Sequence, residues 1–285
     1  MEADPLAPAL LAVKLGLYVS ALLAAGLGLH ASMQIVERGD RARALRSAAW
    51  FGGAALVFAM LRLMIANVQL GGSLNSIFDP ATLSWTWPAL APSSVAFALG
   101  AGLLFVAWLL QRSALAGLAS IALAAAFALT GHTQALEQPG LAPWAAGLHV
   151  LIAAFWIAAP ITLWPRALLS DQIVLVRSER FSRLALFIIP PLFAFGLWLA
   201  VLLAGSVNAL LTSAYGQLLA TKLAIAGAAL GLGAYNKQIV TRKLREAPTE
   251  GRRALTTTLT FDAFLFAGAL ILVGIATTFT GPPTH

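Results

Sequence analysis

The 285-residue sequence contains no cysteine and few charged residues. Without cysteine the chain can form no disulfide, thiolate metal site or iron–sulfur cluster, so a bound metal ion needs His, Met, Asp, Glu or backbone oxygen ligands. Charged residues make up 10% of the chain, whereas soluble domains contain about 25%. The chain also lacks a GxSxG motif and a glycine-rich phosphate loop, and we expect a protein that is not an enzyme.

Hydrophobic residues make up 60% of the chain, and the mean hydropathy is +0.85. They occur in runs of about 17–25 residues, and a helix that rises about 1.5 Å per residue then crosses a hydrocarbon core about 30 Å thick. These runs predict an all-α, polytopic integral membrane bundle whose main surroundings are the lipid bilayer. No stretch is left that would form a separate soluble domain.

The apolar runs predict eight transmembrane helices in one domain, residues 1–285, with four helices in residues 1–128 and four in residues 129–285. Only Gln111-Arg112-Ser113 separates the third and fourth runs, and we expect a tight hairpin there. We interpret the tryptophan-containing stretch 71–90 as an interfacial segment between the second and third spans. The predicted spans are residues 7–29, 48–68, 94–110, 115–130, 144–164, 184–204, 210–235 and 255–278.

Positive charge is confined to alternate loops of this arrangement. All Lys and Arg residues except Lys14, Arg62 and Lys222 lie between predicted spans one and two, three and four, five and six, or seven and eight. By the positive-inside rule these loops face the cytoplasm, and we expect both termini to face outward. The same pattern accounts for the net charge of +7, and we expect no nucleic-acid partner. Residues 1–5 lack the basic region of a signal peptide, so we expect the first helix to be retained.

Two of the four histidines, His132 and His149, flank the connection between the fourth and fifth predicted spans. The connection is short, so both imidazoles are expected on the same side of the membrane, with His149 about 7.5 Å below Trp144. Imidazole is the commonest protein ligand for transition metals, and ionisable side chains inside a membrane helix are rare and usually functional. This pair is therefore the main candidate for a metal site.

Met60 and Met64 lie four residues apart in the outer half of the second predicted span, on one helix face. Two imidazoles and two thioethers at similar depth suit copper better than calcium, magnesium or manganese. The alternative is that both methionines fill gaps in the protein core, as methionine commonly does.

Four charged residues fall inside predicted spans: Lys14, Arg62 and Lys222 in the outer half, and Asp262 nearer the cytoplasm. Cations disfavour a metal ion at close range. They either extend to the membrane surface or face an anionic group such as a propionate, a quinone oxygen or a partner's carboxylate.

The second half of the chain carries several recognisable motifs: "TGHT", "GLHVLIAAFWIAAPITL", "ERFSRLALFIIPPLFAFGLWLA", "TSAYGQLLATKLAIAGAALGLGAYNKQ" and "ATTFTGPP". With these motifs the chain resembles the copper resistance protein D (CopD) family of bacterial inner-membrane proteins. The resemblance covers residues 129–283, and the first four helices agree mainly in number and hydrophobicity.

The resemblance implies copper homeostasis and resistance at the bacterial inner membrane, with copper moving from periplasm to cytoplasm alongside a periplasmic copper carrier of the CopC type. Asp262 stands where a glutamate of the family is expected. The motif positions carried over by resemblance are His132, His149, Tyr215, Lys222 and Asn236. Long Met- and His-rich stretches are absent, so we do not expect a high-capacity copper store.

Together these observations predict that copper, as Cu(I) or Cu(II), is accepted at His132 and His149, with Met60 and Met64 as softer ligands. Arg62, Lys222 and Asp262 are expected to act as gating or structural partners. An alternative is a haem- or quinone-binding membrane oxidoreductase, in which paired histidines ligate haem iron and buried cations neutralise propionates. A further alternative is a structural subunit that docks a periplasmic partner.

Overall fold

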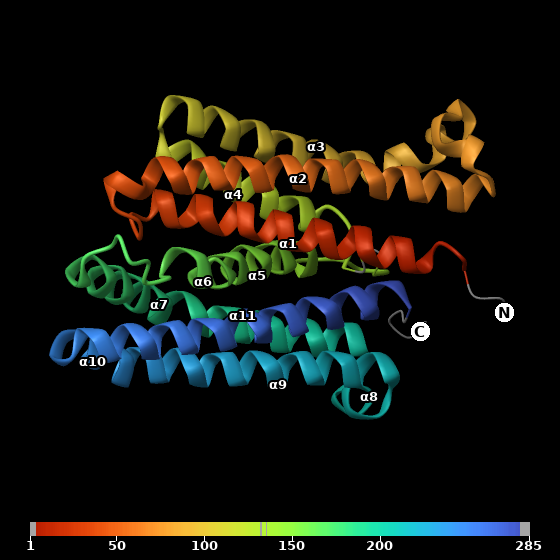
Figure 1. The fold of residues 1–285 in the computed structure, drawn as a ribbon. Helices are drawn as coiled ribbons and strands as arrows, with labels where there is room; N and C mark the ends of the chain where they lie inside the picture. Colours follow the sequence, from red (N-terminus) through yellow and green to blue (C-terminus); the bar gives the residue numbers. More distant parts are fainter. Residues whose placement is uncertain (1–3, 132, 135, 280–285) are drawn as a thin grey trace.

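The computed structural model describes residues 4–131, 133–134 and 136–279, which form helices joined by turns and contain no strand. The prediction of an all-α protein is confirmed. The long helices lie roughly along one axis, and α1 runs between α2 and α5 (Figure 1). In chain order the helices are α1 Ala7–Ser32, α2 Arg38–Gly71, η1 Leu74–Phe78, α3 Pro80–Leu110, α4 Ser113–Ala128, α5 Ala142–Ile157, α6 Ala159–Thr162, α7 Asp171–Ala204, α8 Val207–Thr212, α9 Ala214–Tyr235, η2 Asn236–Val240, α10 Thr241–Glu246 and α11 Pro248–Thr278.

Seven helical segments in the described residues are long and apolar enough to cross a membrane. They include α5 with α6 as Ala142–Thr162, and α9 through α10 as Ala214–Glu246. Helix α4, the fourth predicted span, has only 16 residues, which gives about 24 Å of helix. The chain is therefore a multi-pass membrane protein, and seven of its eight predicted spans have the length that crossing requires.

The start of α1 and the end of α11 lie at the same end of the bundle (Figure 1). There Lys14 donates from Nζ to the backbone oxygen of Thr277 at 2.6 Å, which ties the two helices together. We call this the terminal end. The opposite end, which we call the basic end, carries the α1–α2, α3–α4, α6–α7 and α10–α11 connections (Figure 1).

Helix α3 begins 14 residues before its predicted span, so most of the stretch interpreted as an interfacial segment is helical. The Oδ2 atom of Asp79 accepts from the backbone N–H of Thr82 at 2.9 Å and also from its hydroxyl. Pro80 occupies the first turn, where its missing N–H costs no hydrogen bond. The Thr82 hydroxyl and N–H hold the pKa of the Asp79 carboxyl below its usual value. These capping residues start a helix that the hydropathy pattern did not reveal.

Two other sequence expectations concern helix breaks. The predicted hairpin between the third and fourth spans is confirmed, because α3 ends at Leu110 and Gln111 adopts a left-handed conformation with φ of 51°. The fifth predicted span is divided at Ala158, two residues before Pro160, into α5 and α6. A proline near a helix start cannot continue the preceding hydrogen-bond ladder, which explains the break.

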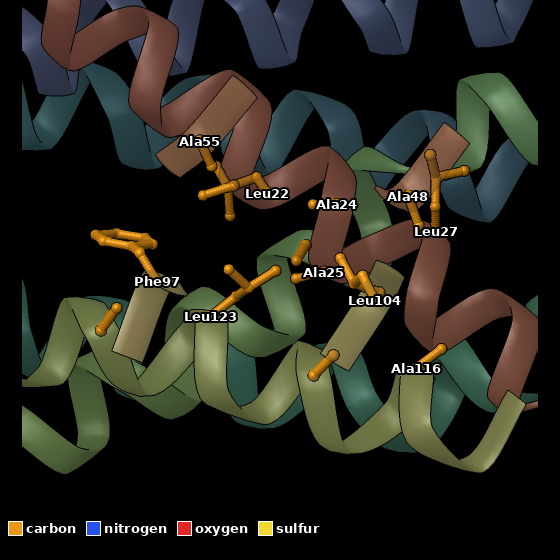
Figure 2. Close-up of a cluster of buried hydrophobic side chains, with 14 of the residues drawn as sticks. Leu22, Ala24, Ala25, Leu27, Ala48, Ala55, Phe97, Leu104, Ala116 and Leu123 are labelled. Carbon is orange, nitrogen blue, oxygen red and sulfur yellow. The ribbon is translucent and has the colours of Figure 1, made fainter. Parts of the chain in front are cut away.

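Helices α1 to α4 pack around a core made mainly of alanine and leucine (Figure 2). Leu27, Leu104 and Leu123 from α1, α3 and α4 are each at most 1% exposed in this core. Alanine allows the helix backbones to approach closely, which is how helices associate in lipid. Helices α1 and α4 of this half pack against α5.

Gly26 is the point of closest approach between α1 and α5. A Cβ atom at this position would lie 2.1 Å from the backbone oxygen of Ala154, so only glycine fits. The contact holds α5 against α1 and leaves its other faces for α4 and α7. Helices α7, α9 and α11 complete the second half of the bundle.

At the basic end, Arg177 of α7 joins two connections that are far apart in sequence. Its side chain is 2% exposed, and Nε donates to Glu37 at 2.7 Å while Nη2 donates to Asp40 at 2.5 Å. Nη1 also donates to the backbone oxygen of Thr162 at 3.2 Å. This buried ion cluster fixes the α1–α2 connection against α6 and α7.

His30 is fully buried beside this cluster. Its Nδ1 lies 2.7 Å from the hydroxyl of Thr162, and its Nε2 lies 2.8 Å from the backbone oxygen of Phe155. Both ring nitrogens therefore have protein partners. This satisfied hydrogen bonding gives His30 a structural role in holding α1 against α5 and α6.

Candidate functional site

A cavity of about 320 Å³ lies between α1, α5, α7, α9 and α11 in the terminal half of the bundle. We call it the terminal-side cavity. Its lining is almost entirely apolar, which is typical of ligand sites in which a few polar groups provide the chemistry. Those polar groups are Tyr18, Thr133, His149 and Lys222.

His149 on α5 is oriented by a hydrogen bond to α7. Its Nδ1 lies 3.1 Å from the backbone oxygen of Leu192. A carbonyl oxygen can only accept, so Nδ1 carries the proton and donates, and in the neutral ring Nε2 then carries the lone pair. Histidine ligands of metals are usually held in this way, with the second nitrogen donating to a carbonyl or carboxylate.

Gly196, one turn after Leu192 on α7, makes room for the imidazole. A Cβ atom at position 196 would lie 3.0 Å from Cε1 of His149 and 3.5 Å from Nδ1. The ring therefore packs directly against the α7 backbone. A side chain at this position would push the imidazole away from Leu192.

Lys222 on α9 lines the same cavity as His149. An ammonium group repels a metal ion at close range in a medium of low dielectric constant. A cation in this cavity would therefore gain from the lone pair on Nε2 of His149 and lose from a charged Lys222. Among the sequence candidates, the structure brings these two residues together.

The second predicted histidine ligand, His132, lies outside the described residues. Its neighbours are placed: Thr133 is 7% exposed and lines the terminal-side cavity. Arg62 donates from Nη2 to the hydroxyl of Thr130 at 3.0 Å. Gln134 donates to the backbone oxygen of Ala128 at 2.6 Å. The connection after α4 is therefore attached to the bundle on both sides of position 132.

The two predicted methionine ligands lie on α2, and the structure does not bring them to His149. The side chain of Met60 is 44% exposed. Helix α1 runs between α2 and α5 (Figure 1), and α2 packs on α1, α3 and α4. A role of Met60 and Met64 in metal binding stays a prediction. Over residues 4–131, 133–134 and 136–279, no three His, Cys, Asp or Glu side chains gather as they do in a preformed metal cage.

Three further candidates occupy other places. Tyr215 is 5% exposed near the start of α9 and lines neither cavity described in this section. Asn236 and Asp262 line a second cavity of about 390 Å³ in the basic half of the bundle, which we call the basic-side cavity. Trp156 and Phe193 line both cavities, so the two spaces adjoin each other.

Lys14 faces the protein rather than an external anion. Its ammonium donates to Thr277 near the end of α11, and cations are favourable at a helix C-terminus. The hydroxyl of Tyr18 lies 3.3 Å from that of Thr277. The half-buried cation at the terminal end therefore takes part in helix packing.

Sequence reasoning missed Tyr18, Trp156 and Phe193 as cavity residues. Hydropathy gives no signal for them, because helices that are apolar on all sides do not show which face points inward. Trp156 lies two turns after His149, a spacing that would place both on similar faces of α5. That spacing is the one sequence signal that connects an aromatic residue with the predicted site.

Residues 175–276 match the family model described as copper resistance protein D. The match confirms the resemblance over α7, α9 and most of α11, which supply much of both cavity linings. It includes Tyr215, Lys222, Asn236 and Asp262 but not His132 or His149. The chain matches no curated protein and no solved structure.

Proposed function

From this copper resistance protein D segment, we propose that the chain is a copper homeostasis protein that binds copper in the terminal-side cavity and imports it across the bacterial inner membrane. The observation that carries the proposal is the family match over residues 175–276, which form much of the cavity wall. The orientation of His149 supports it from independent geometry, because its Nε2 carries a lone pair and its Nδ1 is held by Leu192. Imidazole nitrogen is a suitable copper ligand.

Copper is the cargo of this site and not a permanent cofactor. The described lining offers one imidazole, and we propose His132 as the second ligand because its neighbour Thr133 lines the same cavity. Two neutral nitrogen ligands bind an ion without enclosing it, which suits transfer better than storage. We leave Met60 and Met64 out of this site, because α1 lies between them and α5 (Figure 1).

The proposed orientation places the terminal end in the periplasm and the basic end in the cytoplasm. The concentration of Lys and Arg in the connections at the basic end supports it through the positive-inside rule. It requires α4 to act as a short eighth crossing, which agrees with the start of α1 and the end of α11 lying together. The terminal-side cavity would then receive copper from a periplasmic carrier of the CopC type.

The remaining candidates have supporting roles in this proposal. Arg62 holds Thr130 and so positions the connection that carries His132. Lys222 acts as an electrostatic gate, because its ammonium lowers the affinity of the cavity for a cation and favours release. Tyr215 and Asn236 shape the start and end of α9, the helix that carries Lys222.

Copper uptake into vesicles tests the proposal. Purified protein in lipid vesicles should take up copper from outside, and His149→Ala should reduce uptake to the level of protein-free vesicles. The matched control is Leu148→Ala, since Leu148 is the preceding residue on α5 and is 42% exposed on its outer surface. Equal uptake by wild type, His149→Ala and empty vesicles would refute copper import through this cavity.

A further inference from the structure

The basic-side cavity contains a carboxyl oxygen that has no hydrogen-bond partner among the described residues. Asp262 on α11 is 3% exposed and lines this cavity, and its Oδ1 has no hydrogen-bond partner among the described residues. Most buried polar atoms in proteins are paired. An isolated carboxylate in apolar surroundings carries a large desolvation cost. A feature that is this costly for stability needs a functional explanation.

Asn236 brings a second unsatisfied oxygen into the same cavity. Its side-chain Oδ1 is buried and has no hydrogen-bond partner within the described part of the chain. Asn236 opens the π-helical turn η2, where the hydroxyl of Thr241 donates to the backbone oxygen of Asn236 at 3.0 Å. Single π-helical turns are often found at functional sites. The cavity thus presents two oxygen acceptors, neither of which accepts a hydrogen bond within the described part of the chain.

Few charged groups face Asp262 from the surrounding helices. Lys237 from η2 is the one other charged residue that lines the cavity among those described, and it forms no ion pair with Asp262. The residues contributed by α5, α6, α7, α9 and α10 are all uncharged. Lys237 is therefore the one positive charge among the described lining residues, and no ion pair holds it against Asp262.

An aromatic partition separates this cavity from the terminal-side cavity. Trp156 and Phe193 line both spaces, with ring centroids 6.4 Å apart. Phe266 lies 5.6 Å from Trp156 in an edge-on arrangement and lines the terminal-side cavity. Trp156 is only 4% exposed, so its ring is packed inside the bundle where the two cavities meet. The carboxyl group is therefore on the basic side of the partition and His149 is on the terminal side.

We propose that Asp262 is a proton-exchange site in the basic-side cavity. A proton bound to the carboxyl group converts one of its oxygens from an acceptor into a donor, and it removes the negative charge that no ion pair compensates. When water enters from the basic end, the O–H bond of the acid breaks and the proton passes to water. The carboxylate that remains is solvated by that water and attracted by the Lys237 ammonium. The step moves one proton and involves no oxidation or reduction.

This exchange deepens the proposed function, because coupling of copper passage to proton movement requires a proton site separate from the copper ligands, and Asp262 lies on the basic side of the partition. Only the coupling depends on the proposed function. Proton binding at Asp262 follows from its burial and its missing partner. The two claims are therefore tested by separate measurements.

Infrared spectroscopy of the full chain in lipid nanodiscs tests the proton site without copper. At neutral pH the wild type should show the C=O stretch of a protonated carboxylic acid that is absent from Asp262→Asn, a variant of almost the same shape. The band should shift in D2O and disappear reversibly as pH rises, and Asp262→Glu should restore it. Glu246→Gln, which removes an exposed carboxyl group at the end of α10, is the matched control and should keep the band.

Two outcomes would overturn the site: wild-type and Asp262→Asn spectra that are identical at neutral pH, or a band that never responds to pH or D2O. Coupling is measured by copper uptake into vesicles with and without an imposed pH gradient. The gradient should change uptake by wild type and not by Asp262→Asn, and an equal response by both would refute coupling. Loss of all copper uptake with an intact, pH-sensitive band would instead refute the proposed function and leave the proton site standing.

Discussion

The imidazole of His149 on α5 is held by the backbone oxygen of Leu192 on α7, 3.1 Å from its Nδ1. This bond determines which ring nitrogen carries the proton and leaves Nε2 as a lone-pair donor. It also ties a histidine outside the family match to a helix inside it, because Leu192 lies within residues 175–276. The segment that matches the copper resistance protein D model thus orients the residue that we propose as the copper ligand.

Gly196→Val should weaken copper binding, because a side chain at position 196 meets the His149 ring and displaces it from Leu192. Loss of an orienting partner typically reduces metal affinity by about 10–100-fold. Copper affinity is measured by competition with a chelator of known strength. Gly227→Val is the control, since a Cβ atom there meets nothing within 4 Å. Equal affinities in the two variants would contradict an orienting role for α7.

Lys222→Met should tighten copper binding in the terminal-side cavity. The substitution keeps the length and apolar stem of the side chain but removes a positive charge next to the proposed ion. Release should slow down in parallel, so uptake into vesicles should fall while affinity rises. Lys243→Met, a similar change on α10 at the basic end, should alter neither quantity. A lower copper affinity in Lys222→Met would show that the lysine supports binding instead of opposing it.

Arg177→Ala should destabilise the protein more than loss of an exposed ion pair does. It removes charge-assisted hydrogen bonds to Glu37 and Asp40, and since Asp40 keeps its ion pair with Arg166 the loss should be about 1.5–3 kcal/mol. The comparison is Arg245→Ala, whose ion pair with Glu179 is exposed and should contribute only about 0–1 kcal/mol. Thermal unfolding in detergent measures both. Similar melting temperatures for the two variants would mean that the Arg177 cluster does not hold the basic end together.

An absorption spectrum of the purified protein separates the copper proposal from the haem- or quinone-binding alternative. We expect no Soret band, because the proposed site uses imidazole to bind a transferred metal ion. A Soret band that is lost in His149→Ala would replace copper import with a haem-binding function. The measurement needs no added metal and is independent of the uptake experiments.

Most of the architecture is predictable, because a helix that crosses a membrane needs a long run of apolar residues and such runs are visible in the sequence. The apolar runs predict the positions of the long helices, and Gln111-Arg112-Ser113 correctly predicts the hairpin between α3 and α4. Helix ends are not predictable in this way, because they depend on caps such as Asp79 and not on hydrophobicity. Helix α4 has the 16 residues that its predicted span has, but it begins at Ser113 and ends at Ala128, two residues earlier at each end.

The site is less predictable than the fold. His149 can be found from the sequence because an ionisable group inside a membrane helix is rare. Its partner across the cavity, Lys222, is found for the same reason. The aromatic partition of Trp156 and Phe193 has no such signal, because large apolar residues occur on every face of these helices. Depth alone also suggested that Met60 belongs with His149, whereas the structure places α1 between their helices.

Copper content after purification and desalting tests the central claim most directly. The wild type and the Met60→Leu, Met64→Leu double variant are predicted to retain copper, because neither methionine lies on a helix that forms the terminal-side cavity. His149→Ala and the His132→Ala, His149→Ala double variant are predicted to lose it while remaining folded. Unchanged copper content in both histidine variants would contradict the proposed site.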